Sequence, residues 1–150
     1  MRLANNAEIR VFAKEGEDVQ EITGKLKVLL GFDPEKEKVE LRDRAAEGFE
    51  ERKIHIISAY FDKERQLSAF LSGLSEKLGN EKETLLEQVD SRTDDNLDFF
   101  IRLDKEMLLK GKYVLTDSGN CYHIKISLAA FPKKKEKAEG IVKKILNVNK

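Results

Sequence analysis

Residues 54–61 read Ile-His-Ile-Ile-Ser-Ala-Tyr-Phe, a run dominated by β-branched and aromatic side chains. These side chains favour strands, and a run this apolar is typical of a strand that lies inside a sheet. Asp62 follows as a candidate helix N-cap, and Gly79 is placed to end that helix. Between them the apolar residues recur at the helical period, at Leu67, Phe70, Leu71, Leu74 and Leu78. The stretch therefore predicts a central strand followed by an amphipathic helix.

The residues before this stretch predict a strand, a helix and a weaker strand. Residues 8–14 alternate between two faces, as a half-buried strand does. Asp18 and Gly31 suit the two caps of a helix. Its apolar positions are Val19, Ile22, Leu26, Leu29 and Leu30. A shorter alternation at residues 39–41 predicts a second strand, and the Gly-Phe-Glu sequence at 48–50 predicts a turn into the third.

The residues after it predict two further helices and more antiparallel pairing. Residues 80–83 have the pattern of a capping box that begins a short helix, and residues 90–96 are polar enough to form a loop. Residues 97–103 predict a strand, and residues 113–131 predict a hairpin around the turn at 117–120. Pro132 is expected to open a last helix. Its buried stripe is Ala138, Ile141, Val142 and Ile145.

This order of elements, β-α-β-β-α-α-β-β-β-α, predicts an α+β fold: a mostly antiparallel sheet with helices packed on one face. We expect Leu71, Leu74, Ile126 and Ile141 to share one core between helices and sheet. The chain has 150 residues, a common size for one domain, and no low-complexity linker divides it. We therefore expect a single domain over residues 1–150.

Composition narrows the protein class. Hydrophobic residues make up 40% and charged residues 37%, and no run of about 18 apolar residues could cross a membrane. Residues 1–10 contain no apolar leader, and Cys121 is the single cysteine. A lone thiol cannot form a disulfide within the chain, so we expect a cytoplasmic protein.

Charge is distributed unevenly along the chain. The formal net charge is zero, but residues 99–150 carry 12 Lys and Arg against 5 Asp and Glu, whereas residues 1–98 carry 16 against 23. Such asymmetry is typical of a surface that faces an anionic partner. A folded dipole without a ligand gives the same pattern, so both interpretations stand at this point.

The common catalytic signatures are absent from the sequence: it holds no glycine-rich phosphate loop, no HExxH and no CxxC. His55 and His123 are flanked by apolar strand residues, and Cys121 fits a small structural residue. We therefore expect a protein that is not an enzyme and that has no cofactor and no metal. The least favoured alternative is a metal-dependent phosphodiesterase, in which carboxylates hold Mg²⁺. Its candidate ligands are Asp90, Asp94, Asp95 and Asp98.

The faces of the strands that point away from the helices combine basic and aromatic side chains. They are Arg10, Phe12 and Lys14 in one strand, Phe100 and Arg102 in another, and His123 and Lys125 in a third. Aromatic rings that stack on unpaired bases, together with cations that contact phosphates, are what single-stranded RNA requires. The alternative is that a second copy of the chain covers this face, with Phe12 and Phe100 as dimer contacts.

The expected last helix adds a second basic element. At about 100° per residue, Lys133, Lys137 and Lys144 would share one narrow stripe. A row of lysines can follow a phosphate backbone, although a solvated helix face gives the same pattern.

From about residue 7 to 146 the sequence resembles an archaeal family of predicted exosome-associated RNA-binding proteins. The resemblance is carried by Arg92-Thr93-Asp94-Asp95-Asn96, Phe100-Ile101-Arg102-Leu103-Asp104-Lys105, Gly111-Lys112, His123-Ile124-Lys125-Ile126-Ser127, Ala130-Phe131-Pro132-Lys133-Lys134-Lys135-Glu136 and, earlier, Glu47-Gly48-Phe49 with Ile54. The sequence departs from the family at Glu106-Met107-Leu108-Leu109, where Gln-Ala-Ala-Tyr is usual, at Lys133, where glycine is common, and at residues 50–53.

The resemblance implies a fold similar to ribosomal protein L5 and a non-catalytic role with RNA, as an accessory of an RNA-processing (exosome) or ribosome-related complex. A protein–protein adaptor or homodimer module that uses the same strand face remains the alternative.

Overall fold

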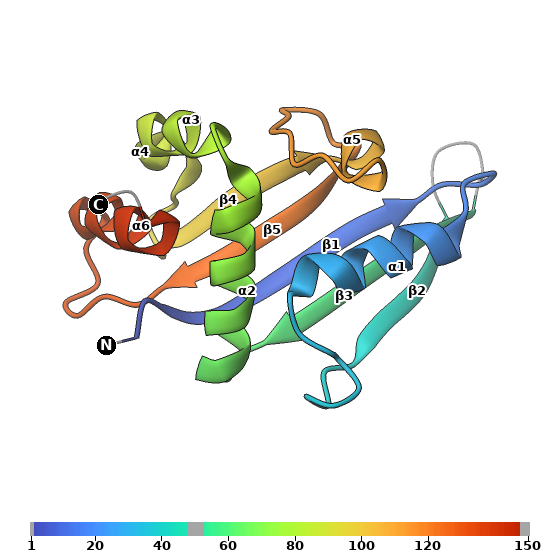
Figure 1. Ribbon diagram of the computed structural model, residues 1–150, viewed down its shortest axis with the longest axis horizontal. Helices are drawn as coiled ribbons and strands as arrows, with labels where there is room; N and C mark the ends of the chain where they lie inside the picture. Colours follow the sequence, from blue (N-terminus) through green and yellow to red (C-terminus); the bar gives the residue numbers. More distant parts are fainter. Residues whose placement is uncertain (1, 48–52, 148–150) are drawn as a thin grey trace.

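The computed structural model describes residues 2–47 and 53–147. They form a five-stranded antiparallel sheet with helices packed against one of its faces, as Figure 1 shows. The strands are β1 (Ala4–Ala13), β2 (Leu41–Glu47), β3 (Lys53–Phe61), β4 (Asp98–Asp104) and β5 (Cys121–Leu128). The predicted α+β class, with an antiparallel sheet and helices on one face, is confirmed.

The strands lie in the order β2-β3-β1-β5-β4, so the first strand of the chain is the central one. Ile9 of β1 lies opposite Ala59 on one side and Ile124 on the other, and Ile124 in turn lies opposite Ile101 of β4. All four side chains are buried. Since residues directly opposite each other in neighbouring strands point to the same face of a sheet, these four mark the face that the helices cover.

The helices are α1 (Val19–Leu30), α2 (Glu64–Leu78), α3 (Glu81–Glu87), α4 (Val89–Arg92), α5 (Lys105–Leu109) and α6 (Ala138–Leu146), with a 3₁₀ turn, η2, at Lys135–Lys137. Figure 1 shows α1 lying along the strands and α2 crossing them, while α3, α4 and α6 gather at one end. Within residues 2–47 and 53–147, no helix has the length and apolar character needed to span a membrane.

The predicted limits of α1 are confirmed by its caps. The Asp18 carboxylate accepts hydrogen bonds from the backbone N–H groups of Gln20 and Glu21, which the first helical turn leaves unpaired. Gly31 ends the helix at φ 77°, and a Cβ there would lie 3.0 Å from the carbonyl oxygen of Ala69. Both the conformation and the close approach to α2 therefore require glycine.

The expected core is also confirmed. Leu71, Leu74 and Ile126 are buried in one apolar cluster between helices and sheet, and Ile141 of α6 packs against that cluster. Phe61 of β3 contributes by edge-to-face contacts with two other rings, at 5.0 and 5.3 Å between centroids. These rings belong to Phe32 and Phe70. Such pairs add about 0.5–1.5 kcal/mol each beyond the area that they bury.

Two predicted helix caps are wrong. The helix after β3 begins at Glu64 rather than after Asp62, and the side chain of Gln66 accepts a hydrogen bond from the Lys63 N–H at 3.2 Å. The side chain of Asn80 makes no capping hydrogen bond to α3, so the expected capping box is not formed. The turn predicted at residues 48–50 lies outside the described residues.

Three predicted elements in the second half are also wrong. Residues 113–115 do not form a hairpin with β5, because β5 pairs with β1 and β4, and Leu115 makes only an isolated bridge to Leu103. The predicted loop at 90–96 begins inside α4. The last helix begins at Ala138 rather than at Pro132, and the backbone of Lys134 is still extended, at φ −128° and ψ 132°.

Candidate functional site

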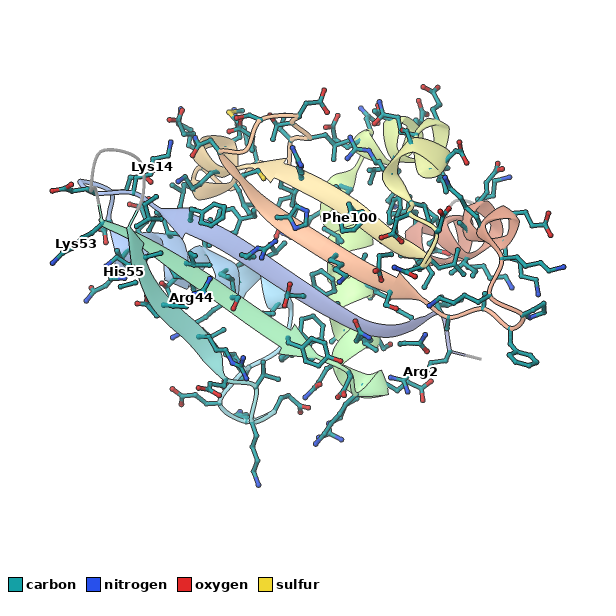
Figure 2. All side chains as sticks on the ribbon, turned by 180° about the vertical axis from the view of Figure 1, so that it is seen from behind. Arg2, Lys14, Arg44, Lys53, His55 and Phe100 are labelled. Atoms are coloured by element: carbon teal, nitrogen blue, oxygen red, sulfur yellow. The ribbon has the colours of Figure 1, made fainter. Side chains whose placement is uncertain are left out.

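The face of the sheet opposite the helices is covered by no other described element, and Figure 2 shows it from that side. We call it the open face. Its side chains alternate with the buried ones along each strand. They are Arg42, Arg44 and Ala46 of β2; Ile54, Ile56, Ser58 and Tyr60 of β3; Asn6, Glu8, Arg10 and Phe12 of β1; His123, Lys125 and Ser127 of β5; and Asp98, Phe100 and Arg102 of β4.

Three arginines lie in one line across the open face. The strand register places Arg42 opposite Ser58, Ser58 opposite Arg10, Arg10 opposite His123, and His123 opposite Arg102. The line therefore crosses all five strands. Because neighbouring strands are ~4.8 Å apart, successive arginines in this line are ~10 Å apart. We call Arg42, Arg10 and Arg102 the arginine row.

The histidine in this line, His123, is partly buried and lies among positive charges. Burial lowers the pKa of His123, and the positive charges of Arg10, Arg102 and Lys125 lower it further, while Glu8 opposes them. The imidazole is therefore neutral at pH 7, because its ordinary pKa of 6.5 is already below that. His123 therefore adds no positive charge to the row, and the charge of the row comes from its arginines.

Aromatic side chains lie on both sides of the arginine row. On one side Tyr60 is opposite Glu8, Glu8 is opposite Lys125, and Lys125 is opposite Phe100. On the other side Phe12 is opposite Ile56. Tyr60 is 53% exposed and Phe12 is 41% exposed, so both rings are accessible to a ligand.

A hollow of about 530 Å³ lies at the β4 edge of the open face. Its lining comes from three parts of the chain: Gln88, Ser91 and Arg92 around α4, Phe100 and Arg102 of β4, and Asp117 and His123 before and within β5. We call it the edge hollow. The rings of Phe100 and His123 lie side by side in it, with centroids 5.5 Å apart and a 39° tilt.

Two arginines in the edge hollow are held by hydrogen bonds. Arg92 Nε donates to Gln88 Oε1 at 2.8 Å, and Arg102 Nη1 donates to the carbonyl oxygen of Asp117 at 3.1 Å. Each bond uses one of the five N–H groups that a guanidinium carries. The remaining N–H groups give the hollow the fork geometry that suits phosphate and carboxylate groups.

The other predicted basic residues of the strands are placed less favourably. Lys125 lies on the open face, but its Nζ is 3.7 Å from Asp98 Oδ2, which offsets part of its charge. Lys14 lies beyond the end of β1, and Figure 2 places it at the tip of the sheet near Lys53. Of the strand residues predicted as RNA contacts, Arg10, Phe12, Phe100 and Arg102 are therefore brought together, with Lys125 beside an acidic partner.

The predicted lysine stripe is not formed. Lys133 lies in the irregular segment before η2, and Lys137 lies in η2 with its Nζ donating to the carbonyl oxygen of Phe131 at 3.0 Å. Lys144 lies on α6, where it lines a separate hollow with residues of α2 such as Glu64 and Glu76. Since α6 packs against α2, α3 and α4, this lysine belongs to the helix layer and not to the open face.

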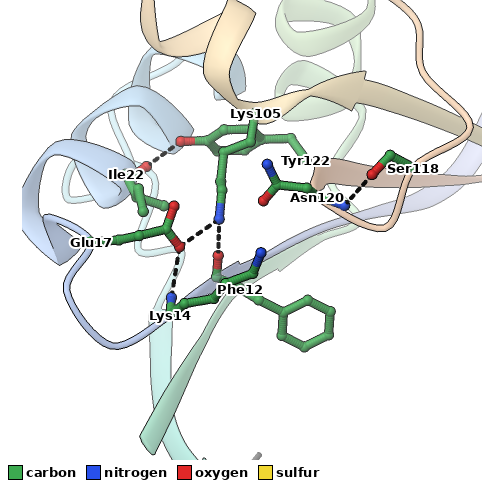
Figure 3. Close-up of polar contacts among 8 residues, drawn as sticks. All are labelled: Phe12, Lys14, Glu17, Ile22, Lys105, Ser118, Asn120 and Tyr122. Carbon is green, nitrogen blue, oxygen red and sulfur yellow. Dashed lines mark hydrogen bonds and ion pairs between the residues drawn. The ribbon is translucent and has the colours of Figure 1, made fainter. Parts of the chain in front are cut away.

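The end of β1 is held on the helix side of the sheet by the buried amine of Lys105, as Figure 3 shows. Lys105 is 1% exposed, and its Nζ donates to the carbonyl oxygen of Phe12 and to Glu17 Oε1, at 2.8 Å each. The backbone N–H of Lys14 donates to the same carboxylate oxygen at 2.8 Å. Burial raises the pKa of Glu17, but the bonds from Lys105 and Lys14 outweigh it and hold that pKa below its ordinary value.

The cysteine and two of the aspartates considered for catalysis are protonated, bonded within a turn or paired with a lysine. Burial raises the pKa of the Cys121 thiol more than the nearby positive charge of Arg102 lowers it, so the thiol stays protonated at pH 7. Asp94 Oδ1 accepts from the backbone N–H groups of Asn96 and Asp98, so it closes a turn. Asp90 lies 3.6 Å from Lys135 Nζ. Among residues 2–47 and 53–147, no three His, Cys, Asp or Glu side chains gather as metal ligands would.

Sequence reasoning missed several residues of this surface. Arg42, Arg44 and Tyr60 were not identified because their strand faces depend on the pairing of β2 with β3 and of β3 with β1. Arg92 was not identified because residues 90–96 were expected to form a loop.

Comparisons with known proteins identify the family and the fold. A family model described as RNA binding matches residues 6–128. The chain is 28% identical over 134 residues to the RNA-binding protein PAB1135 of Pyrococcus abyssi, covering 89% of this chain and 87% of that protein. The solved structure of Mth689, a DUF54 protein of Methanothermobacter thermautotrophicus, superposes with a TM-score of 0.78 at 24% identity, covering 96% and 98% of the two chains. SSO0741 of Sulfolobus solfataricus gives 0.77 at 25% identity, covering 97% and 100%.

Proposed function

Because this chain belongs to the protein family described as RNA binding, we propose that it is a non-catalytic protein that holds single-stranded RNA on its open face. The observation that carries the proposal is the arginine row, which crosses the whole sheet between aromatic side chains. Arginines contact phosphates irrespective of sequence, and exposed rings such as Tyr60 and Phe12 offer surfaces on which unpaired bases stack.

Single-stranded RNA suits this surface better than duplex RNA. Bases in a duplex are stacked on one another, so their faces cannot reach aromatic side chains. Phe12 and Tyr60 are more than 40% exposed on the same face as the arginine row, so rings and cations can contact one strand together.

The test is a titration of a fluorescent single-stranded oligoribonucleotide at several salt concentrations. Replacing Arg10 or Arg42 by Gln should weaken binding of all sequences and lower the slope of log K against log salt by ~0.7 per arginine. Lys110→Gln is the matched control, because Lys110 is an exposed cation at the end of α5. Equal slopes for the arginine variants and the parent protein would overturn the proposal.

The complex in which the protein acts is a further part of the proposal. The resemblance to exosome-associated proteins supports a role as an accessory subunit of an RNA-processing or ribosome-related complex. The measurement is purification of the tagged protein from its own cells, with and without ribonuclease. Recovery of neither exosome nor ribosomal subunits would overturn the complex role and leave RNA binding untouched.

A homodimer that closes over the open face is the competing function, and one observation favours it. Phe12 and Tyr60 are exposed on the same face as Ile54 and Ile56, which gives the β1–β3 half an apolar character. Light scattering at rising protein concentration separates the two functions. A mass of about 17.2 kDa at all concentrations supports the RNA surface, whereas a dimer that Phe12→Ala dissociates supports the interface.

A further inference from the structure

We propose that the edge hollow holds one unpaired nucleotide of the bound RNA, with its base against Phe100 and its phosphate at Arg92 and Arg102. The inference rests on the proposed function and adds to it a nucleotide subsite at the β4 edge of the open face. The seven lining residues come from the region of α4, from β4, from β5 and from the segment that leads into β5.

The size of the edge hollow is appropriate for one nucleotide. Its volume of about 530 Å³ lies within the ~300–1,000 Å³ usual for small-molecule pockets. It opens on the open face beside the end of the arginine row, because Arg102 belongs both to the row and to the lining. A strand that follows the row therefore reaches the hollow without leaving the sheet.

The aromatic wall suits a base. Phe100 is half-buried, so its ring is held in position while one side remains accessible. The ring of His123 extends this wall, 5.5 Å away. Since burial and the neighbouring arginines lower the pKa of His123, its ring is uncharged at pH 7 and stacks without repelling the arginines.

The polar residues suit a phosphate and the edge of a base. Arg92 and Arg102 supply two guanidinium groups, and Asp117 is the single acidic residue among the seven that line the hollow. Gln88 uses its Oε1 to orient Arg92, which leaves its amide N–H₂ as a donor toward a base acceptor. The hollow thus combines a stacking surface, two phosphate ligands and one amide donor.

The test compares a mononucleotide with a longer RNA. Adenosine 5′-monophosphate and a single-stranded oligoadenylate are titrated separately, with backbone amide NMR shifts as the readout. Phe100→Leu keeps an apolar side chain but removes the ring, and Arg92→Gln removes one cation. Lys110→Gln is the matched control, since Lys110 is an exposed cation that lies outside both the open face and the hollow.

Phe100→Leu should weaken binding of the mononucleotide by ~5- to 140-fold, the loss expected when one base no longer stacks. Arg92→Gln should also weaken it, whereas Lys110→Gln should leave it unchanged. Both hollow variants should weaken oligoadenylate binding in parallel. In the parent protein, the amides shifted by the mononucleotide should cluster around Phe100 and His123.

Two other results would overturn the inference in distinguishable ways. If the oligoadenylate binds through Arg10 and Arg42 while the hollow variants bind both probes as the parent does, the nucleotide subsite is wrong and the open-face function stands. If the mononucleotide needs Phe100 and Arg92 but no oligoribonucleotide binds, the RNA function is wrong, and with it the subsite as an RNA contact.

Discussion

The Nζ atom of Lys105 lies 2.8 Å from the backbone carbonyl oxygen of Phe12, and this hydrogen bond joins α5 to the end of the central strand. The side chain of Phe12 points the other way, onto the open face. A buried amine on the helix side of the sheet therefore fixes the backbone that carries an exposed aromatic ring.

Removing this amine should destabilise the protein. Lys105→Met keeps a long side chain but removes the donor to the Phe12 carbonyl, and it leaves Glu17 with only the bond from the Lys14 N–H. We expect a loss of about 1–3 kcal/mol in the free energy of unfolding, the usual cost of unpaired buried polar groups. Urea unfolding measures it. Lys110→Met, at an exposed position in the same segment, should change stability by less than about 0.5 kcal/mol. Equal effects of the two variants would contradict the role of the buried amine.

The Glu17–Lys105 pair should make stability depend on pH in acid. The pKa of Glu17 is lower in the folded protein than its ordinary value of 4.5. Its contribution to stability is therefore fully present above that value and is lost as the pH falls through the lower, folded pKa. Unfolding midpoints measured between neutral pH and pH ~3 should fall more steeply for the parent protein than for Glu17→Gln, which has no carboxyl to titrate. Identical pH profiles would show that the pair contributes nothing.

Truncation of the central leucine of α2 should be costly. Leu74 is 2% exposed within the core, and Leu74→Ala should lower the free energy of unfolding by about 2–5 kcal/mol because it loses apolar contacts and leaves a cavity. Chemical denaturation checks the value. Ser72→Ala, an exposed position two residues earlier on the same helix, provides the comparison and should be close to neutral.

The lysines near the C-terminus should matter little for RNA. Lys144 belongs to the helix layer, and Lys137 is bonded to the backbone of Phe131. The triple replacement of Lys133, Lys137 and Lys144 by Gln should change RNA affinity by less than about threefold, since separated surface charges are screened at physiological salt. Titration at two salt concentrations tests this. A loss as large as that of Arg10→Gln would place the RNA on the segment that holds these lysines instead.

Local signals in the sequence were sufficient for part of the fold. Asp18 and Gly31 identify both ends of α1, because a capping carboxylate and a left-handed glycine act within a few residues. The alternation in residues 8–14 assigns Arg10 and Phe12 to one face of β1, because successive side chains of a strand point to opposite faces. Pro132 shows the limit of such signals. The first turn of a helix accepts a proline, but α6 begins only at Ala138, where the chain has reached the helix layer.

The candidate site depends on contacts that no local signal contains. The arginine row exists because β3 lies between β2 and β1 and β5 lies between β1 and β4, so residues 42, 10 and 102 come into line only through these pairings. The edge hollow likewise requires the packing of α4 beside β4. Sequence patterns assign side chains to faces of strands, but they do not establish which strands are adjacent.

The position of β5 has a consequence for protein synthesis. The central strand β1 is made first, yet its partner β5 ends at Leu128, so the sheet can close only after nearly the whole chain has left the ribosome. A nascent chain that ends before Cys121 carries Arg10 and Arg42 on β1, β2 and β3 but has neither a continuous arginine row nor a complete edge hollow. Only the finished chain therefore presents the continuous arginine row and the complete edge hollow.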